Sequence, residues 1–184
     1  MRIGILAVQG GFDSHARALA AAGYTAVLVR EPRDLDGLAG LVLPGGESTT
    51  QWKLIARHGL GPALVAFVRS GKPVLATCAG LILLASKVRN PEQPSFALLD
   101  VQVARNAWGR QLDSFEAAPD GGGDPMVFIR APRIEAAGQG VEVLATYRGE
   151  PVLVRQGSVT GAAFHPELGS PAAYARLFPW SAPS

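Results

Sequence analysis

The amino-acid sequence predicts an α/β domain of three layers: a mainly parallel, twisted sheet flanked by helices, with an added antiparallel portion. In the first half of the chain, short apolar runs alternate with segments whose apolar residues recur at helical spacing, which is the order of β-α-β units. In the second half, strand-like runs follow one another with few residues between them, and such short connections favour antiparallel pairing. We expect one domain to span residues 1–184.

The expected elements of the first half are four buried strands and four helical segments. The strands are short apolar runs, as parallel strands buried on both faces should be: Ile3–Val8, Ala26–Val29, Leu41–Leu43 and Val74–Ala76. The helical segments keep their apolar residues on one face, and they lie at Phe12–Ala20, Trp52–Ala56, Leu64–Val68 and Leu81–Ala85.

The second half is expected to add strands and one short helix. The strand-like runs are Val101–Ala104, Val127–Ile129, Val141–Thr146, Val152–Arg155 and Val159–Phe164. Gly121–Gly123 is expected at a loop tip, because apolar runs resume directly after it. A short helix is expected over Ala172–Phe178, within the tail that follows Leu168.

Composition excludes several classes of protein. The chain has 184 residues, of which 48% are hydrophobic and 17% charged. Such a chain can bury a substantial core, so a disordered chain is excluded. The net charge is only +2, and the sequence contains no run of Lys and Arg, whereas nucleic-acid binding usually shows a basic stripe. We therefore expect no nucleic-acid partner.

Membrane insertion, secretion and metal binding are also not expected. The longest nearly apolar stretch, Val74–Ala85, is shorter than the roughly 20 residues that span a bilayer. The apolar run at the N-terminus lacks the length and cleavage site of a signal peptide. One cysteine excludes an intrachain disulfide, and one cysteine with three scattered histidines lacks the spacing of a metal site. These features predict a cytoplasmic protein without a membrane or metal partner.

Cys78 is the first candidate for chemistry. It follows a buried strand and precedes small residues and a helix-compatible run. A turn from strand to helix lifts a side chain above the carboxyl edge of a sheet, and backbone N–H groups at the helix start favour negative charge there. The alternative is a buried structural cysteine, which is common. The residues around Cys78 leave both interpretations open.

His165 and Glu167 form the second candidate set, in the segment His165-Pro166-Glu167. A cysteine nucleophile needs a base that takes and returns a proton, and a carboxylate can fix the tautomer of that base. The other two histidines are weaker candidates for catalysis. His58 stands at a polar helix end, and His15 is expected on the surface of the first helix.

The third candidate is the loop Pro44–Thr49, between a predicted strand and a predicted helix. Its glycines allow backbone N–H groups to approach a ligand and stabilise an oxyanion. The loop lacks the Gly-Lys-Ser/Thr ending of a phosphate-binding P-loop. Taken alone, it could be a plain turn with a Ser or Thr helix cap. Together with a Cys, a His and a Glu at strand ends, it points to acyl transfer through a thioester.

These three segments resemble the motifs of class I, triad-type glutamine amidotransferases. They are Leu43–Ser48, Thr77–Gly80 and Phe164–Glu167. Further segments resemble the glutaminase subunits of pyridoxal 5′-phosphate synthases, the PdxT/SNO family: Ala7–Gly10, Gly45–Thr50, Cys78–Ala85, Arg105–Gln111, Ser114–Glu116 and Val127–Pro132. The similarity covers roughly Ile3–Leu168, and the tail after Leu168 matches poorly. Ala76 and Trp108 depart from the residues usual in the family.

The resemblance implies a flavodoxin-like fold and a defined set of roles. Cys78 would attack the side-chain amide of L-glutamine, His165 would protonate the leaving ammonia, and Glu167 would orient His165. Backbone N–H groups of Gly46 and Ala79 would hold the oxyanion. The implied glutamine-binding residues are Gly46, Glu47, Ser48, Arg105, Ile129 and Arg130. For the two arginines, ion pairs with Glu47 or Glu116 are the alternative.

The resemblance also implies a partner and excludes a cofactor. Ammonia would pass to a separate synthase subunit, a (β/α)₈ barrel, which makes pyridoxal 5′-phosphate from ribose 5-phosphate and glyceraldehyde 3-phosphate. The alternative within the same class is a glutaminase subunit of another amidotransferase, such as imidazole glycerol phosphate synthase. A partner-independent Cys hydrolase and a catalytically silent binding subunit are further alternatives.

Overall fold

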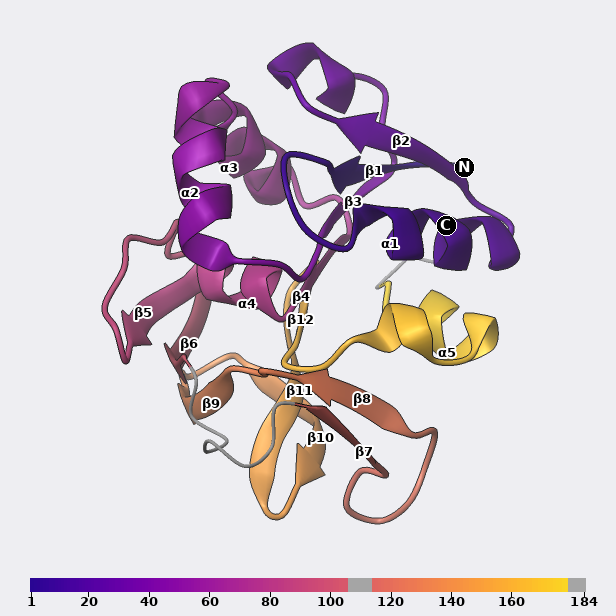
Figure 1. Ribbon diagram of the computed structural model, residues 1–184, viewed down its shortest axis with the longest axis vertical. Coiled ribbons are helices and arrows are strands. Elements are labelled where there is room, and N and C mark those ends of the chain that lie inside the picture. Colours follow the sequence, from indigo (N-terminus) through magenta and orange to yellow (C-terminus); the bar gives the residue numbers. More distant parts are fainter. Residues whose placement is uncertain (106–113, 179–184) are drawn as a thin grey trace.

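The computed structural model describes residues 1–105 and 114–178 and is built around a seven-stranded sheet (Figure 1). Its strands are β1 (Arg2–Leu6), β2 (Thr25–Val29), β3 (Gly40–Leu43), β4 (Val74–Thr77), β10 (Glu142–Tyr147), β11 (Glu150–Gln156) and β12 (Val159–Ala162). They lie in the order β10-β11-β12-β4-β3-β1-β2. The five strands from β12 to β2 are parallel, and β10 and β11 extend the sheet by antiparallel pairing. The predicted mainly parallel sheet with an antiparallel portion is therefore confirmed.

Helices cover both faces of this sheet. They are α1 (Phe12–Ala21), α2 (Ser48–Arg57), α3 (Gly61–Arg69), α4 (Ala79–Leu84) and α5 (Pro171–Ala175). Figure 1 shows α2 and α3 on one side of the parallel strands and α1 and α5 on the other. Among the described residues, no helix is long and apolar enough to cross a membrane.

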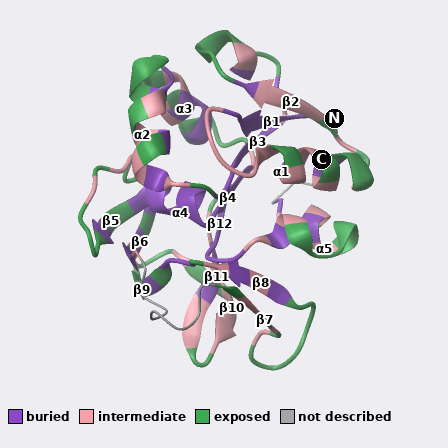
Figure 2. Ribbon diagram, in the orientation of Figure 1, coloured by how far each residue is buried: buried purple, intermediate pink, exposed green. Residues whose placement is uncertain are grey.

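The layers follow from the alternation of side chains along each strand. Ile3, Val42 and Leu75 pack with Leu19 of α1 and Tyr174 of α5 in one core cluster. Their neighbours along the strands point the other way, into a larger cluster shared with α2, α3 and α4. Both clusters contain fully buried side chains, so the parallel strands are apolar on both faces. Figure 2 shows this burial along the central strands and α4.

Two small sheets complete the fold. The first contains β5 (Ala85–Arg89), β6 (Leu99–Ala104) and β9 (Arg133–Ala137), and the second contains β7 (Ser114–Ala117) and β8 (Met126–Ile129). The sequence pattern does not predict β5, β7 or β9. Each has at most two buried residues, so the apolar pattern that marks a strand is weak in all three.

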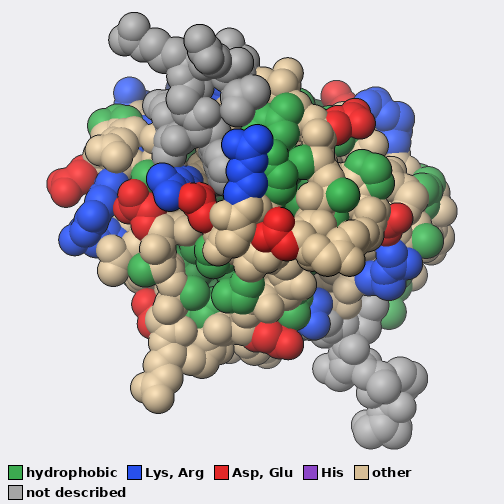
Figure 3. All heavy atoms as spheres, turned by 90° about the horizontal axis from the view of Figure 1, so that it is seen from below, with side chains coloured by type: hydrophobic (Ala, Val, Ile, Leu, Met, Phe, Trp, Pro, Cys, Tyr) green, Lys and Arg blue, Asp and Glu red, His purple; other side chains and the backbone are tan. Residues whose placement is uncertain are grey.

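Smaller differences concern element ends. The first strand ends at Leu6, and the apolar helix ends at Leu84, because Ala85 already pairs in β5. Helix α5 ends at Ala175, although Phe178 beyond it still packs in the core. Gly121–Gly123 lies in the exposed turn between β7 and β8, as expected. On the face seen in Figure 3, described acidic and basic side chains are interspersed.

The sharp connection from β4 to α4 depends on Gly80. A Cβ atom at residue 80 would lie 2.0 Å from the backbone oxygen of Leu43 and 2.7 Å from its carbonyl carbon. Helix α4 therefore approaches β3 so closely that only a hydrogen fits between them. All six residues of α4 are buried, which leaves little room for the helix to move away.

We predict that Gly80→Ala lowers the free energy of unfolding by about 1–3 kcal/mol or more, the usual range for an overpacked core. Chemical denaturation would measure the change. Gly61→Ala is the matched control, because a Cβ there meets its first neighbour, Phe96, at an ordinary 3.7 Å. That control should be neutral or slightly stabilising, since alanine favours a helix more than glycine does. Equal stability of Gly80→Ala and wild type would contradict this account of the α4 packing.

Candidate active site

The sheet order places the three candidate segments at one edge. Strands β12, β4 and β3 are consecutive neighbours, and all three are parallel. Their carboxyl ends therefore meet at the same edge of the sheet, where open α/β sheets bind ligands. The loop Gly45–Gly46 follows β3, Cys78 follows β4, and His165 follows β12 after two residues. Neighbouring strands thus bring together residues that are far apart in the sequence.

Cys78 stands on a strained turn between β4 and α4. Its φ is 48° and its ψ is −104°, a conformation that is costly for a residue with a side chain. Two backbone hydrogen bonds hold it: the Cys78 N–H donates to Ala162 O at 2.8 Å, and Cys78 O accepts from the Ile82 N–H at 3.2 Å. The side chain is 6% exposed. This is the geometry expected for a nucleophile on a strand-to-helix turn.

His165 and Glu167 form a close pair beside Cys78. The His165 Nδ1–H donates to Glu167 Oε1 at 2.8 Å, and the carboxylate side chain is 3% exposed. Burial alone would lower the pKa of His165, but the neighbouring Cys78 side chain and the hydrogen-bonded Glu167 carboxylate raise it to about 10. Burial would raise the pKa of Glu167, yet the bond from His165 and the neighbouring imidazoles lower it. The pair favours an imidazolium next to a carboxylate.

The prediction that His15 is a surface residue is wrong. Its side chain is 0% exposed, because α1 turns this position and Leu19 toward the sheet. His15 Nδ1 lies 2.7 Å from the Tyr174 hydroxyl, and Nε2 lies 3.2 Å from Thr77 Oγ1. The same Nε2 lies 3.3 Å from Glu167 Oε2. His58, by contrast, is exposed at the end of α2, as expected.

The glycine loop after β3 faces the histidine and the cysteine. A Cβ atom at Gly45 would lie 2.5 Å from His165 Cε1 and 3.4 Å from Cys78 Cβ. The loop is held from outside by the segment after β1. The Gly11 N–H donates to Gly45 O at 3.0 Å, and the Glu47 N–H donates to Gln9 Oε1 at 2.9 Å. The close approach to His165 therefore requires glycine at position 45.

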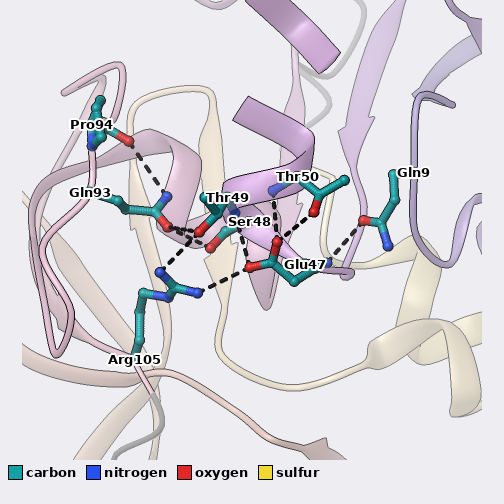
Figure 4. A network of polar contacts seen from close by, with 8 residues as sticks. All are labelled: Gln9, Glu47, Ser48, Thr49, Thr50, Gln93, Pro94 and Arg105. Atoms are coloured by element: carbon teal, nitrogen blue, oxygen red, sulfur yellow. Dashed lines mark hydrogen bonds and ion pairs between the residues drawn. The ribbon is translucent and has the colours of Figure 1, made fainter. Parts of the chain in front are cut away.

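Glu47 caps helix α2 and joins a polar network (Figure 4). Its carboxylate accepts from the backbone N–H groups of Thr49 and Thr50 and from the Thr50 hydroxyl, the last at 2.7 Å. The Arg105 guanidinium pairs with it at 3.1 Å, so the expected ion pair with Glu47 is present. Partial burial opposes ionisation, but hydrogen bonds from Thr50 and Thr49 lower the pKa of Glu47 to about 2. The Glu47 carboxylate is therefore occupied by partners within the protein.

Ser48 is likewise occupied by a protein partner. Its hydroxyl donates to Gln93 Oε1 at 2.7 Å, and Figure 4 shows Gln93 reaching toward it from a separate loop. Arg105 also donates to Thr49 Oγ1 at 3.2 Å. The side chains at the start of α2 therefore hold one another.

A cavity of about 270 Å³ lies over this edge of the sheet. Its lining includes eight of the predicted site residues: Gly46, Glu47, Ser48, Cys78, Arg105, Ile129, Arg130 and His165. Glu167 stands behind His165 and not in the lining, and Ala79 is buried as the first residue of α4. The other lining residues are Gly45, which belongs to the predicted loop, and Gly11, Ile82 and Pro132, which the sequence did not predict as site residues.

Other residues of the site also escaped the sequence analysis. His15, Tyr174 and Gln93 lie far in sequence from the groups they contact. The helical spacing between His15 and Leu19 places both side chains on one face of the helix, which indicates that His15 is buried with Leu19. Asn106–Gln111, including Trp108, lies outside the described residues. Within those residues, no group of His, Cys, Asp or Glu could hold a metal ion.

The arrangement suits nucleophilic acyl transfer. A buried thiol, an imidazole paired with a carboxylate, and a glycine loop open onto a cavity large enough for a small polar molecule. These are the parts needed to form and hydrolyse a thioester.

Comparison with known proteins gives this site a family. A family model described as "SNO glutamine amidotransferase family" matches residues 5–179, which includes most of the tail after Leu168. The chain is 52% identical over 172 residues to "Pyridoxal 5'-phosphate synthase subunit PdxT" of Geobacillus kaustophilus, covering 91% of this chain and 88% of that protein. It is 47% identical over 173 residues to the protein of the same name from Thermotoga maritima, covering 91% and 92%.

Solved structures agree with the sequence relatives. "Crystal structure of glutamine amidotransferase" superposes with a TM-score of 0.88 at 44% identity, covering 95% of this chain and 96% of the other. "Structure of PurLQS from Thermotoga maritima" superposes with a TM-score of 0.63 at 18% identity, covering 90% and 87%, and at that identity it supports the fold alone. With a family model matching nearly the whole chain and relatives about half identical to it, the chain belongs to the SNO glutamine amidotransferase family.

Proposed function

We propose that this chain is the glutaminase subunit of a pyridoxal 5′-phosphate synthase. It hydrolyses L-glutamine to L-glutamate and ammonia and delivers the ammonia to a synthase subunit. One observation carries the proposal: Cys78, the His165–Glu167 pair and the Gly45–Gly46 loop open together onto a cavity of about 270 Å³. The identity of about half to PdxT subunits of such synthases supports the assignment.

In the proposed reaction, His165 takes the proton of the Cys78 thiol as Sγ attacks the side-chain amide carbon of glutamine. The C–S bond forms as the carbonyl oxygen takes up negative charge. When the C–N bond breaks, His165 gives its proton to the leaving nitrogen, and ammonia departs. Water then attacks the glutamyl thioester with His165 as base, and the C–S bond breaks to release glutamate and restore the thiol. Glu167 holds His165 through the Nδ1 bond during both steps.

Backbone groups are the proposed oxyanion donors. The Ala79 N–H stands at the start of α4, directly after the nucleophile, and Gly46 belongs to the loop that faces His165 and Cys78. Fixed donors of this kind act in a site shielded from water, and losing one typically costs about 10²–10³ in rate.

The remaining proposed roles concern glutamine binding by Gly46, Glu47, Ser48, Arg105, Ile129 and Arg130. Arg130 suits the carboxylate of the substrate on grounds of charge and position in the lining. Arg105 already pairs with Glu47, but a guanidinium has five N–H donors and can hold a second acceptor. Glu47 and Ser48 lie in the cavity lining, where their backbone groups are available although their side chains have protein partners.

The proposed partner is a synthase subunit with a (β/α)₈ barrel, in a hetero-oligomer that keeps ammonia from water. Such a barrel would condense the ammonia with ribose 5-phosphate and glyceraldehyde 3-phosphate. The cytoplasm is the proposed compartment.

Cys78→Ala should abolish glutamine hydrolysis by the complex with the synthase subunit, because no other group can form the thioester. The same complex should still make pyridoxal 5′-phosphate when ammonium salt replaces glutamine, which serves as the internal control. Glutamate release and product absorbance would be measured side by side. Hydrolysis at the wild-type rate would remove Cys78 from the mechanism, and loss of both reactions would indicate failed assembly.

Arg130→Ala should raise KM for glutamine by about 10- to 100-fold, the range for losing a hydrogen bond to a charged group. Steady-state kinetics of glutamate release in the complex would measure the change. Arg133→Ala is the control, since Arg133 pairs with Glu150 and is not in the cavity lining. An unchanged KM in Arg130→Ala would exclude this side chain from substrate binding.

The raised pKa of His165, about 10 against an ordinary 6.5, predicts a pH-dependent contribution to stability. Between pH 6.5 and about 10, His165 is therefore protonated in the folded chain and deprotonated in the unfolded chain. The contribution is therefore complete below pH 6.5 and is lost as pH rises toward 10. Denaturant titrations of wild type and His165→Gln across this range should show the difference in unfolding free energy shrinking with pH. A constant difference would show that the imidazole is not preferentially charged in the fold.

A further inference from the structure

His15 is a buried polar group that the proposed reaction does not use. It lies on α1, is 0% exposed, and contacts groups from three other elements. Its Nδ1 faces the hydroxyl of Tyr174 on α5, and its Nε2 faces Thr77, the last residue before the nucleophile. Nε2 also lies 3.3 Å from Glu167 Oε2. A buried imidazole that reaches both the strand before Cys78 and the carboxylate behind His165 is well placed to influence the reaction.

The hydrogen-bond partners determine which nitrogen of His15 carries the proton. Burial lowers the pKa of His15 to about 4, despite the nearby charge of Glu167, so the ring is neutral at neutral pH. Burial also raises the pKa of Tyr174 far above its usual value, so the phenol keeps its proton. If that proton is donated to Nδ1, then the neutral ring carries its own proton on Nε2. This tautomer directs an N–H toward Thr77 and Glu167.

Glu167 needs such a donor. Its Oε1 accepts from His165, whereas Oε2 is buried and has no hydrogen bond of ordinary geometry among the described residues. A buried carboxylate oxygen without a donor is costly and favours the protonated form. The titratable groups that act on Glu167 are His165 and His15, and those that act on His15 are Glu167 and His165, with Tyr174 at its other nitrogen. His15 Nε2, at 3.3 Å, is the polar group that lies beside Oε2.

We propose that His15 is a positioning residue for glutamine hydrolysis: held by Tyr174, it fixes the Glu167 carboxylate through Oε2, so that Oε1 stays aligned with His165. This inference rests on the proposed function. It makes the segment around α5 part of the active-site support, because Tyr174 is the link between that helix and the imidazole.

The test compares variants that keep or remove the donor. His15→Phe removes the Nε2–H, whereas His15→Gln retains an amide N–H near the same place. Tyr174→Phe removes the hydroxyl that selects the tautomer and leaves the imidazole. His58→Gln is the matched control, because His58 is exposed at the end of α2. Each variant is assayed as the complex with the synthase subunit, for kcat and KM between pH 5 and 9, and its melting temperature is measured.

Cys78 alkylation by iodoacetamide over the same pH range gives a second readout that does not depend on glutamine. For His15→Phe we expect kcat to fall about 10- to 100-fold, as misplacement of a catalytic group can cause, with KM within about twofold. The acid limbs of the kcat–pH profile and of the alkylation–pH profile should move to higher pH, because the pKa of Glu167 rises when the donor is removed. His15→Gln should recover most of kcat, and Tyr174→Phe should show a smaller shift in the same direction.

Two results would overturn the inference: unchanged acid limbs in His15→Phe, or equal losses in His15→Phe and His15→Gln that follow the melting temperature. If His15→Phe does not fold, an unshifted profile in folded Tyr174→Phe overturns it as well. Failure of the proposed function looks different. Wild type would then release no glutamate with the synthase subunit, while the alkylation profiles of the variants would still report on His15.

Discussion

The parallel pairing of β12, β4 and β3 is the constraint on which the rest of the site depends. Each strand ends in a segment that carries one part of the chemistry, and the register between strands fixes how close these parts lie. Ala162 pairs with Thr77, so the chain leaves β12 and β4 at the same level. The Cys78 N–H bond to Ala162 O then ties the strained turn to the neighbouring strand. The strain at Cys78 persists because the surrounding sheet and the buried helix α4 leave no alternative path.

Glycines make this close packing possible, and they act at two separate contacts. Gly80 allows α4 to lie against the end of β3, and Gly45 allows the loop after β3 to lie against His165. Any side chain at either position would push apart the thiol, the imidazole and the loop. Tertiary contacts therefore require glycine at positions 45 and 80, although each glycine taken alone could belong to an ordinary turn.

The site also contains a buried charge, the Glu167 carboxylate. Glu167 is almost fully buried, yet its pKa is lowered, since His165 donates to one oxygen and His15 faces the other. In a poorly polarisable interior these contacts are stronger than at the surface, and a missing partner is more costly. The polar network around Glu47 is different. It is partly exposed, it caps α2, and it orders the loop that lines the cavity.

Several features can be predicted from the sequence: the α/β class, the parallel core strands, the segments around Cys78, His165 and the glycine loop, and the family resemblance. These are local patterns: apolar runs, helical spacing and short motifs, and each can be seen within a few residues. The weakly apolar strands β5, β7 and β9 could not be seen in that way, because their pairing partners lie elsewhere in the chain.

Only the tertiary structure decided the place of His15, the pairing of Arg105 with Glu47 and the contact of Ser48 with Gln93. The physical reason is the same in each case. Whether a polar side chain is a surface group, a ligand contact or a support depends on which groups meet it across long sequence separations. His15 lies on an amphipathic helix, and it is buried in part because Tyr174, from near the other end of the chain, packs against it.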